Sequence, residues 1–141
     1  MISNARGCIA GIVMPVAMAQ CEPVLPEFIY HIALPEHYAA ALAAGVYTMS
    51  TRDVSMEREG YMHASFERQV AATLARYYSD VPSVCILVID THRVAGAGLK
   101  VVVEQLGASP EPFPHVYGAL ALPCDAIVRV RSAAEWDSGM H

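Results

Sequence analysis

Three histidines of this chain lie inside short apolar segments: His31 in F-I-Y-H-I-A, His63 in G-Y-M-H-A-S and His115 in F-P-H-V-Y-G. A buried imidazole ring needs hydrogen-bond partners for both of its nitrogens, so these placements are costly unless partners are supplied. Histidine also changes its charge near neutral pH, which suits it to acid–base catalysis. The three placements predict one polar pocket built from separate strands, with these histidines as its candidate catalytic residues.

Hydroxyl groups accompany two of the histidines. Side chains two positions apart on a strand share a face, so Tyr61 and Ser65 face the same way as His63, and Tyr117 faces the same way as His115. A cleft bordered by both strands would hold imidazoles, phenols and a hydroxyl, which can transfer protons or orient a phosphate, ribose or carbonyl group. We therefore expect these three residues, together with Tyr47, to bind substrate.

Each of these residues also has a simpler interpretation. Ser65 stands where it could cap a following helix, the tyrosines could be core aromatics, and His115 could bond a turn carbonyl. A three-histidine zinc site is conceivable, but the histidines lack close spacing, so we expect no metal. A serine hydrolase is disfavoured because Ser65 does not stand in a nucleophile-elbow sequence.

The elements that must position these side chains follow from apolar runs and chain-breaking residues. Strands or short extended pieces are predicted at 28–33, 46–50, 60–64, 84–89, 99–104, 113–120 and 126–130. Helices are predicted over 35–44, ended by Gly45, and from an N-cap at Ser65 to about residue 78. Residues 51–59 and 90–98 are expected to be loops. The pattern predicts an α+β domain with a small split sheet, mixed or antiparallel, and two main helices.

Composition narrows the class of protein. The chain has 141 residues, 55% of them hydrophobic, which is enough for one domain with a real core. A net charge of −5 argues against nucleic acid as a partner, and no apolar stretch is long enough to span a membrane. The four cysteines include no C-x-x-C pair, which favours reduced thiols in a cytoplasmic protein.

The two ends of the chain differ from its centre. Ala17-Met18-Ala19 follows an apolar run, as in a secretory signal, but the run is short and is interrupted by Pro15. We expect residues 1–27 to form an arm that packs on the domain or contacts a second copy in a homodimer. Residues 28–131 would be the single α+β domain, and 132–141 a polar tail anchored by Trp136.

Between Ile29 and about Val130 the sequence resembles an uncharacterised, mainly bacterial family, domain of unknown function nine-fifty-two. Several separated motifs carry this resemblance in the correct order. They are I-Y-H-I-A at 29–33, A-x-x-A-G-x-Y ending at Tyr47, E-G-Y-M-H-A-S at 59–65, Q-V at Gln69, L-V-I-D ending at Asp90, V-x-x-E ending at Glu104, and F-P-H-V-Y-G at 113–118.

The resemblance implies an ADP-ribosyltransferase-like fold, in which a split sheet forms a cleft for a nicotinamide dinucleotide (NAD). By the same resemblance His31 would bind the nicotinamide-side ribose, and His63 or Tyr61 would lie near the nicotinamide. Glu104 is a candidate for a third position, which is often glutamate in that superfamily. A fold alone does not fix an activity.

Three functions therefore remain open. The first is a small-molecule enzyme with a histidine-lined cleft that binds NAD and transfers ADP-ribose. The second is a cofactor-free acid–base enzyme of specialised metabolism, such as a cyclase, isomerase or hydrolase. The third is a ligand-binding module without catalysis. RNA as a substrate is a poor fit to the charge balance.

Overall fold

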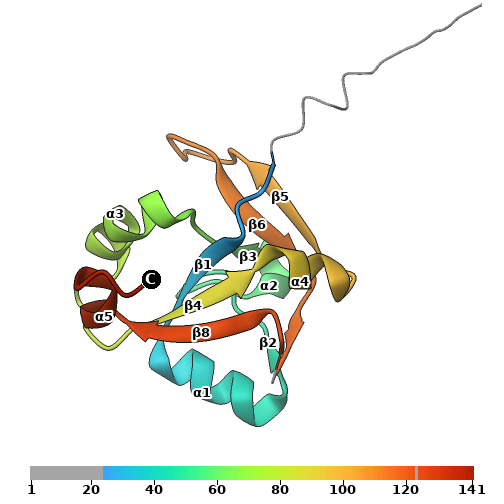
Figure 1. Ribbon diagram of the computed structural model, residues 1–141, viewed down its shortest axis with the longest axis horizontal. Coiled ribbons are helices and arrows are strands. Elements are labelled where there is room, and N and C mark those ends of the chain that lie inside the picture. Colours follow the sequence, from blue (N-terminus) through green and yellow to red (C-terminus); the bar gives the residue numbers. More distant parts are fainter. Residues whose placement is uncertain (1–23, 123) are drawn as a thin grey trace, which may run out of the picture.

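The structure is a computed structural model that describes residues 24–122 and 124–141. Within these ranges the chain forms eight strands and five helices (Figure 1). In chain order they are β1 (Phe28–Ala33), α1 (Pro35–Ala44), β2 (Val46–Tyr47), α2 (Met56–Glu59), β3 (Met62–His63), α3 (Glu67–Tyr77), β4 (Cys85–Asp90), α4 (Thr91–Gly96), β5 (Lys100–Glu104), β6 (Phe113–Tyr117), β7 (Leu120–Ala121), β8 (Ile127–Ser132) and α5 (Ala133–Asp137).

The strand β4 occupies the centre of a three-stranded antiparallel sheet with the order β1-β4-β8. Its sequence V-C-I-L-V-I predicts a central strand, and residues 86–89 are fully buried. A strand that is apolar at every position can be buried on both faces. The positions of β1 and β4 confirm the strands predicted at 28–33 and 84–89.

A second antiparallel sheet has the order β3-β6-β5, and β2 pairs with β7. The segment 62–65 joins the two larger sheets. Met62 and His63 pair with β6, whereas Ser65 forms an isolated bridge with Tyr30 of β1, through backbone hydrogen bonds of 2.9 and 2.7 Å. The sheets therefore separate at Ala64. The α+β class with antiparallel sheets is confirmed.

The helix α1 follows its prediction at both ends. Pro35 stands in its first turn, where a missing backbone N–H costs nothing, and Gly45 ends it with a φ of 82°. A left-handed residue at that position favours glycine because it carries no Cβ. The predicted helix over 35–44 is correct.

The start of α3 differs from the prediction, which was wrong about the cap. Ser65 does not cap this helix, because its backbone is committed to the bridge with Tyr30. Phe66 is the N-cap residue, and its N–H donates to the side-chain Oε1 of Gln69 at 2.9 Å. A glutamine three residues into a helix can serve the cap backbone in this way.

Two segments expected to be loops contain short helices. In α2 the N-cap Ser55 accepts from the N–H of Arg58, and in α4 the N-cap Asp90 accepts from the N–H of Arg93. Polar composition concealed both helices, although each begins at a residue that caps well. The tail also contains a helix, α5, whose Trp136 is buried against Tyr30 with ring centroids 4.9 Å apart.

The β1-β4-β8 sheet separates two apolar clusters. One contains Leu87 and Ile89 of β4 with the residues packed toward β3 and β6, such as Met62 and Val116. The other contains Ile86 and Val88 with residues of α3 and α5, which lie together beside β1 in Figure 1. Successive side chains of β4 therefore point alternately into the two clusters.

The predicted arm lies mostly outside the described residues, as do Cys8 and Cys21. Within the described ranges, no helix combines the length and apolar character needed to cross a membrane.

Candidate functional site

The strands β3 and β6 bring His63 and His115 directly opposite each other. Nδ1 of His63 lies 3.3 Å from Nε2 of His115, and Nδ1 of His115 lies 2.9 Å from Oε1 of Glu104. Glu104 reaches this position from β5, the next strand of the same sheet. The three side chains form a continuous hydrogen-bonded series, which we call the Glu104–His115–His63 relay.

Two tyrosines surround the carboxylate end of the relay. The Tyr117 hydroxyl donates to the same Oε1 of Glu104 that accepts from His115. These two hydrogen bonds hold the pKa of Glu104 below its usual value, so the carboxylate stays ionised. The Tyr61 ring stacks on His115 with centroids 3.9 Å apart and an interplanar angle of 16°.

The ionised carboxylate fixes the hydrogens along the relay. Glu104 can only accept, so Nδ1 of His115 must carry a hydrogen. In the neutral ring Nε2 is then an acceptor, and Nδ1 of His63 must donate to it. This leaves a lone pair on Nε2 of His63, whose ring makes its hydrogen bond within residues 24–122 and 124–141 through Nδ1. That nitrogen can take a proton from a ligand.

His31 lies behind this relay and holds the backbone of His63. Its Nδ1 donates to the carbonyl of His63 at 2.6 Å, and its Nε2 accepts from the Tyr47 hydroxyl at 2.8 Å. The N–H of His63 donates to the carbonyl of Ser50 at 3.2 Å. Both polar groups of the His63 backbone are thus fixed, and both nitrogens of the His31 ring are engaged.

Burial keeps His31 and His63 uncharged at neutral pH. It lowers the pKa of His31 to about 4, more than the hydrogen bond to the His63 carbonyl raises it. Burial also lowers the pKa of His63 to about 4, and the neighbouring His115 and His31 act in the same direction. At neutral pH the lone pair on Nε2 of His63 is therefore available.

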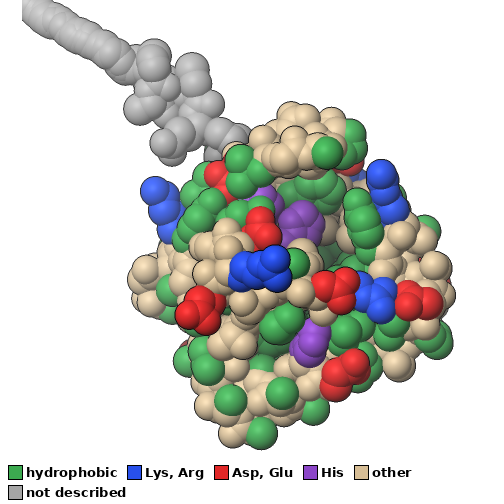
Figure 2. All heavy atoms as spheres, turned by 180° about the vertical axis from the view of Figure 1, so that it is seen from behind, with side chains coloured by type: hydrophobic (Ala, Val, Ile, Leu, Met, Phe, Trp, Pro, Cys, Tyr) green, Lys and Arg blue, Asp and Glu red, His purple; other side chains and the backbone are tan. Residues whose placement is uncertain are grey.

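His63 lies at a cavity of about 530 Å³, which we call the large cavity. Its walls come from the loop 51–53, from α3 and from the connection 105–112 between β5 and β6, with Phe113 beside His63. His31 and His115 are not among its lining residues. Figure 2 shows histidine side chains beside a hollow on this face, with charged side chains around it. The volume suits a small organic molecule.

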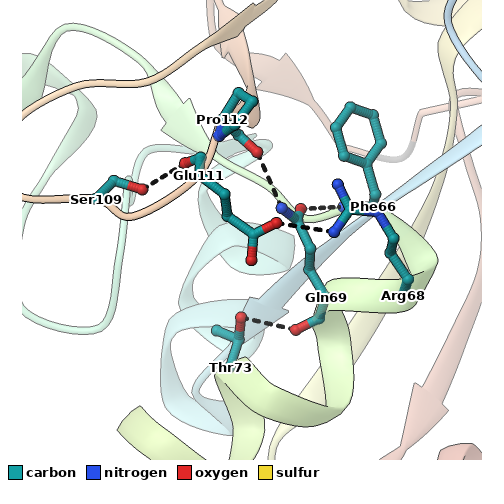
Figure 3. Close-up of polar contacts among 7 residues, drawn as sticks. All are labelled: Phe66, Arg68, Gln69, Thr73, Ser109, Glu111 and Pro112. Atoms are coloured by element: carbon teal, nitrogen blue, oxygen red, sulfur yellow. Dashed lines mark hydrogen bonds and ion pairs between the residues drawn. The ribbon is translucent and has the colours of Figure 1, made fainter.

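One wall of the large cavity is held by the polar contacts in Figure 3. The buried Gln69 donates from Nε2 to the carbonyl of Pro112 at 2.9 Å, and its Oε1 accepts from the N–H of the N-cap residue Phe66. On the surface Arg68 pairs with Glu111 at 2.8 Å. These contacts fasten the 105–112 connection to α3.

The structure places the predicted site residues in one network, in different ways. His63, His115, Glu104, Tyr61 and Tyr117 meet around the relay. His31 and Tyr47 lie in the core behind His63, and Ser65 lines a much smaller second cavity. Sequence reasoning did not assign Ser50, Gln69 or Thr73 to the site. The spacing of Gln69, Thr73 and Arg76 on one helical face was the available signal.

Within residues 24–122 and 124–141, no group of three potential metal ligands converges on one point. The relay side chains instead contact one another in series, and the central ring of His115 is occupied on both nitrogens.

Comparison with known proteins gives a family and a fold. Residues 32–130 match the family model described as Protein of unknown function (DUF952). The fold is similar to that of protein CC0527 from Caulobacter crescentus, with 20% identity and a TM-score of 0.60 over 74% of this chain and 84% of that chain. A double mutant of the same protein matches equally, with 21% identity, a TM-score of 0.60 and the same shares of each chain. None of the curated proteins matches the chain.

Proposed function

The chain belongs to DUF952, a family of unknown function, and from the geometry of its site we propose a small-molecule enzyme in which His63 transfers protons. The observation that carries this proposal is the Glu104–His115–His63 relay, whose free nitrogen belongs to a residue lining the large cavity. A base that is uncharged at neutral pH and is oriented by a second group is typical of acid–base catalysis.

The relay can accept a proton from a substrate and transfer the resulting charge from His63 to His115. When a substrate C–H or O–H yields its proton to Nε2 of His63, the hydrogen on Nδ1 can pass to Nε2 of His115. The positive charge then rests on His115, beside the Glu104 carboxylate. The reverse sequence returns a proton to the product, so atoms and charge balance over the cycle.

The test uses a reaction that reports any positioned base. Ring opening of 5-nitrobenzisoxazole begins with abstraction of a C–H proton and is followed by absorbance. We expect the wild-type chain to accelerate it, and His63→Ala to reduce this acceleration by about 100-fold or more. His92→Ala, at an exposed position in α4, is the matched control. Equal rates for the wild type and His63→Ala would contradict the proposal.

A second candidate is the transfer of ADP-ribose from NAD on an ADP-ribosyltransferase-like fold. The separation of the two sheets at Ala64 favours it, because a split sheet is what the resemblance implies. His31 fits the expected ribose contact poorly, since it is 2% exposed and both of its nitrogens are engaged. Calorimetric titration with NAD decides this: heat that is lost in His63→Ala would favour the transferase, and no heat would leave the cofactor-free enzyme.

The same variants test the third candidate, a binding module without catalysis. A module would bind small molecules in the large cavity and leave them unchanged, and 5-nitrobenzisoxazole would bind without opening.

We also propose that the protein is cytoplasmic, which fits the free thiols of Cys85 and Cys124. A homodimer through residues 1–27 also remains a proposal, tested by sedimentation with and without those residues.

A further inference from the structure

A second cavity, the small chamber, adjoins the large cavity. Its accessible volume is about 10 Å³. Most of its exposed wall is apolar, but its lining residues include the hydroxyl-bearing Ser50, Ser65 and Thr73 and the imidazole-bearing His31 and His63. A polar cavity of on the order of 10–15 Å³ has room for a single water molecule. The chamber therefore has the size of a one-water site, and it has hydroxyl-bearing residues along its wall.

Ser50 supplies the reason why this site needs an occupant. The residue is fully buried, and its Oγ has no hydrogen-bond partner among the described residues. Its backbone is engaged, because its N–H donates to the carbonyl of Val54 at 2.8 Å and its carbonyl accepts from the N–H of His63. A buried hydroxyl without a partner is unfavourable, and a water in the adjoining chamber would satisfy it.

The small chamber adjoins the place where a substrate would react. Four residues line both cavities: Thr51, His63, Thr73 and Tyr78. A water anchored at Ser50 would thus lie next to the imidazole that we propose as the base. Water beside a general base is a nucleophile for a carbonyl carbon.

We propose that the small chamber binds one water molecule through Ser50, and that this water is a reactant at His63. The inference rests on the proposed function and names its substrate class, aldehydes and ketones that can form hydrates. The water oxygen bonds to the carbonyl carbon, the C=O π pair moves to the carbonyl oxygen, and Nε2 of His63 takes one water proton. Return of a proton to that oxygen completes the hydrate, with no other reactant consumed.

The first experiment asks whether the water is present. A crystal structure of the full chain at high resolution should show a water within about 3.2 Å of Ser50 Oγ. The same water should be absent or displaced in Ser50→Ala. A dry chamber in the wild-type crystal would overturn the proposal.

The second experiment asks whether this water reacts. Exchange of the carbonyl oxygen of benzaldehyde with ¹⁸O-labelled water is followed by mass spectrometry. We expect the wild type to accelerate exchange over buffer, and Ser50→Ala to lower the acceleration about tenfold. Ser83→Ala, at an exposed serine, is the matched control. A Ser50→Ala rate equal to that of the wild type, or no acceleration by the wild type, would overturn the reactant role.

The two proposals can fail separately, because opening of 5-nitrobenzisoxazole consumes no water. A wild type that opens this ring but exchanges no ¹⁸O would retain His63 as a base and lose the reactant water. A water seated at Ser50 in a protein that opens no ring would instead contradict the proposed function, and with it the reactant role.

Discussion

The carboxylate of Glu104 determines which nitrogen of each histidine carries a hydrogen. In Glu104→Gln the amide can donate as well as accept, so the ordering of hydrogens along the relay is lost. We expect the rate of 5-nitrobenzisoxazole opening to fall by about 10- to 100-fold, the loss that is typical when a group that orients a metal-bound histidine is replaced. Nitrogen-15 NMR should show a changed tautomer at His63. Glu57→Gln, an exposed carboxylate on α2, is the control.

Unchanged tautomers in Glu104→Gln would mean that the carboxylate does not govern the relay. A slower reaction with unchanged tautomers would assign Glu104 a purely electrostatic role.

Because His31 is buried, the free energy of unfolding should depend on pH. Its pKa is about 4 in the folded chain and 6.5 when unperturbed, so the unfolded chain binds more protons between these values. The free energy of unfolding should be highest above pH 6.5 and fall by on the order of 3 kcal/mol as the pH drops to about 4. His63 shifts in the same direction. Urea titrations across this range measure the effect.

The matched variant is His31→Gln, whose amide can contact the same two partners without titrating. Its stability should depend less steeply on pH between 6.5 and 4. An identical pH dependence in the variant and the wild type would show that His31 is not responsible.

The sequence indicated several of these residues but not their partners. The alternation of Tyr61 with His63, and of His115 with Tyr117, predicts that each pair shares a face, and both tyrosines do lie at the relay. The pairing of Glu104 with His115 depends on the register of the β5–β6 hairpin across the 105–112 connection. Turn signals in a long connection do not fix that register.

At the scale of elements, α3 and the 105–112 connection together form one wall of the large cavity. A buried amide and a surface ion pair hold these two segments together. Gln69→Leu would leave the half-buried N–H of Phe66 and the carbonyl of Pro112 without partners, so we expect it to lower the free energy of unfolding by roughly 1–3 kcal/mol. Arg68→Ala removes a surface ion pair with Glu111 and the contact of its guanidinium with the Phe66 ring, and should cost about 1 kcal/mol or less.

Denaturant unfolding of both variants measures this difference. The reverse order of stabilities would show that the surface pair, and not the buried amide, fastens the connection.

The elements themselves were predictable where the chain has an apolar run, as in β1 and β4, or where alanines lie between a proline and a glycine, as in α1. The short helices α2 and α4 were not, because their residues are mostly polar and their caps were the only signal. At Ser65 a favourable capping residue was overridden by a tertiary contact, the bridge to Tyr30.

At the scale of the whole molecule, neighbouring residues of β4 support different clusters. Ile86→Ala would open a cavity on the α3 side and Leu87→Ala on the β6 side, since both residues are fully buried. Each substitution should cost about 2–5 kcal/mol. Because one strand carries both clusters, we expect a single unfolding transition by fluorescence and circular dichroism in both variants. Two separate transitions in either variant would contradict this cooperativity.

Whole-molecule arrangement was the part of the fold that the sequence defined least. The α+β class followed from the order of apolar runs, but the division into separate sheets depends on β2, β3 and β7, each two residues long. Extended pieces were predicted at 46–50 and 60–64, which contain β2 and β3, but pieces this short carry too little alternation to show which strands they pair with.

The segment 62–65 makes chain length a constraint on how this site can evolve. Met62 and Ala64 enter the apolar cluster, while His63 between them meets His115. One residue inserted or deleted between Gly60 and Ala64 would exchange these sides, burying the base and exposing the core. Descendants of this gene can therefore accept no odd change of length here. Viable insertions should instead accumulate in the 105–112 connection, where they leave this alternation untouched.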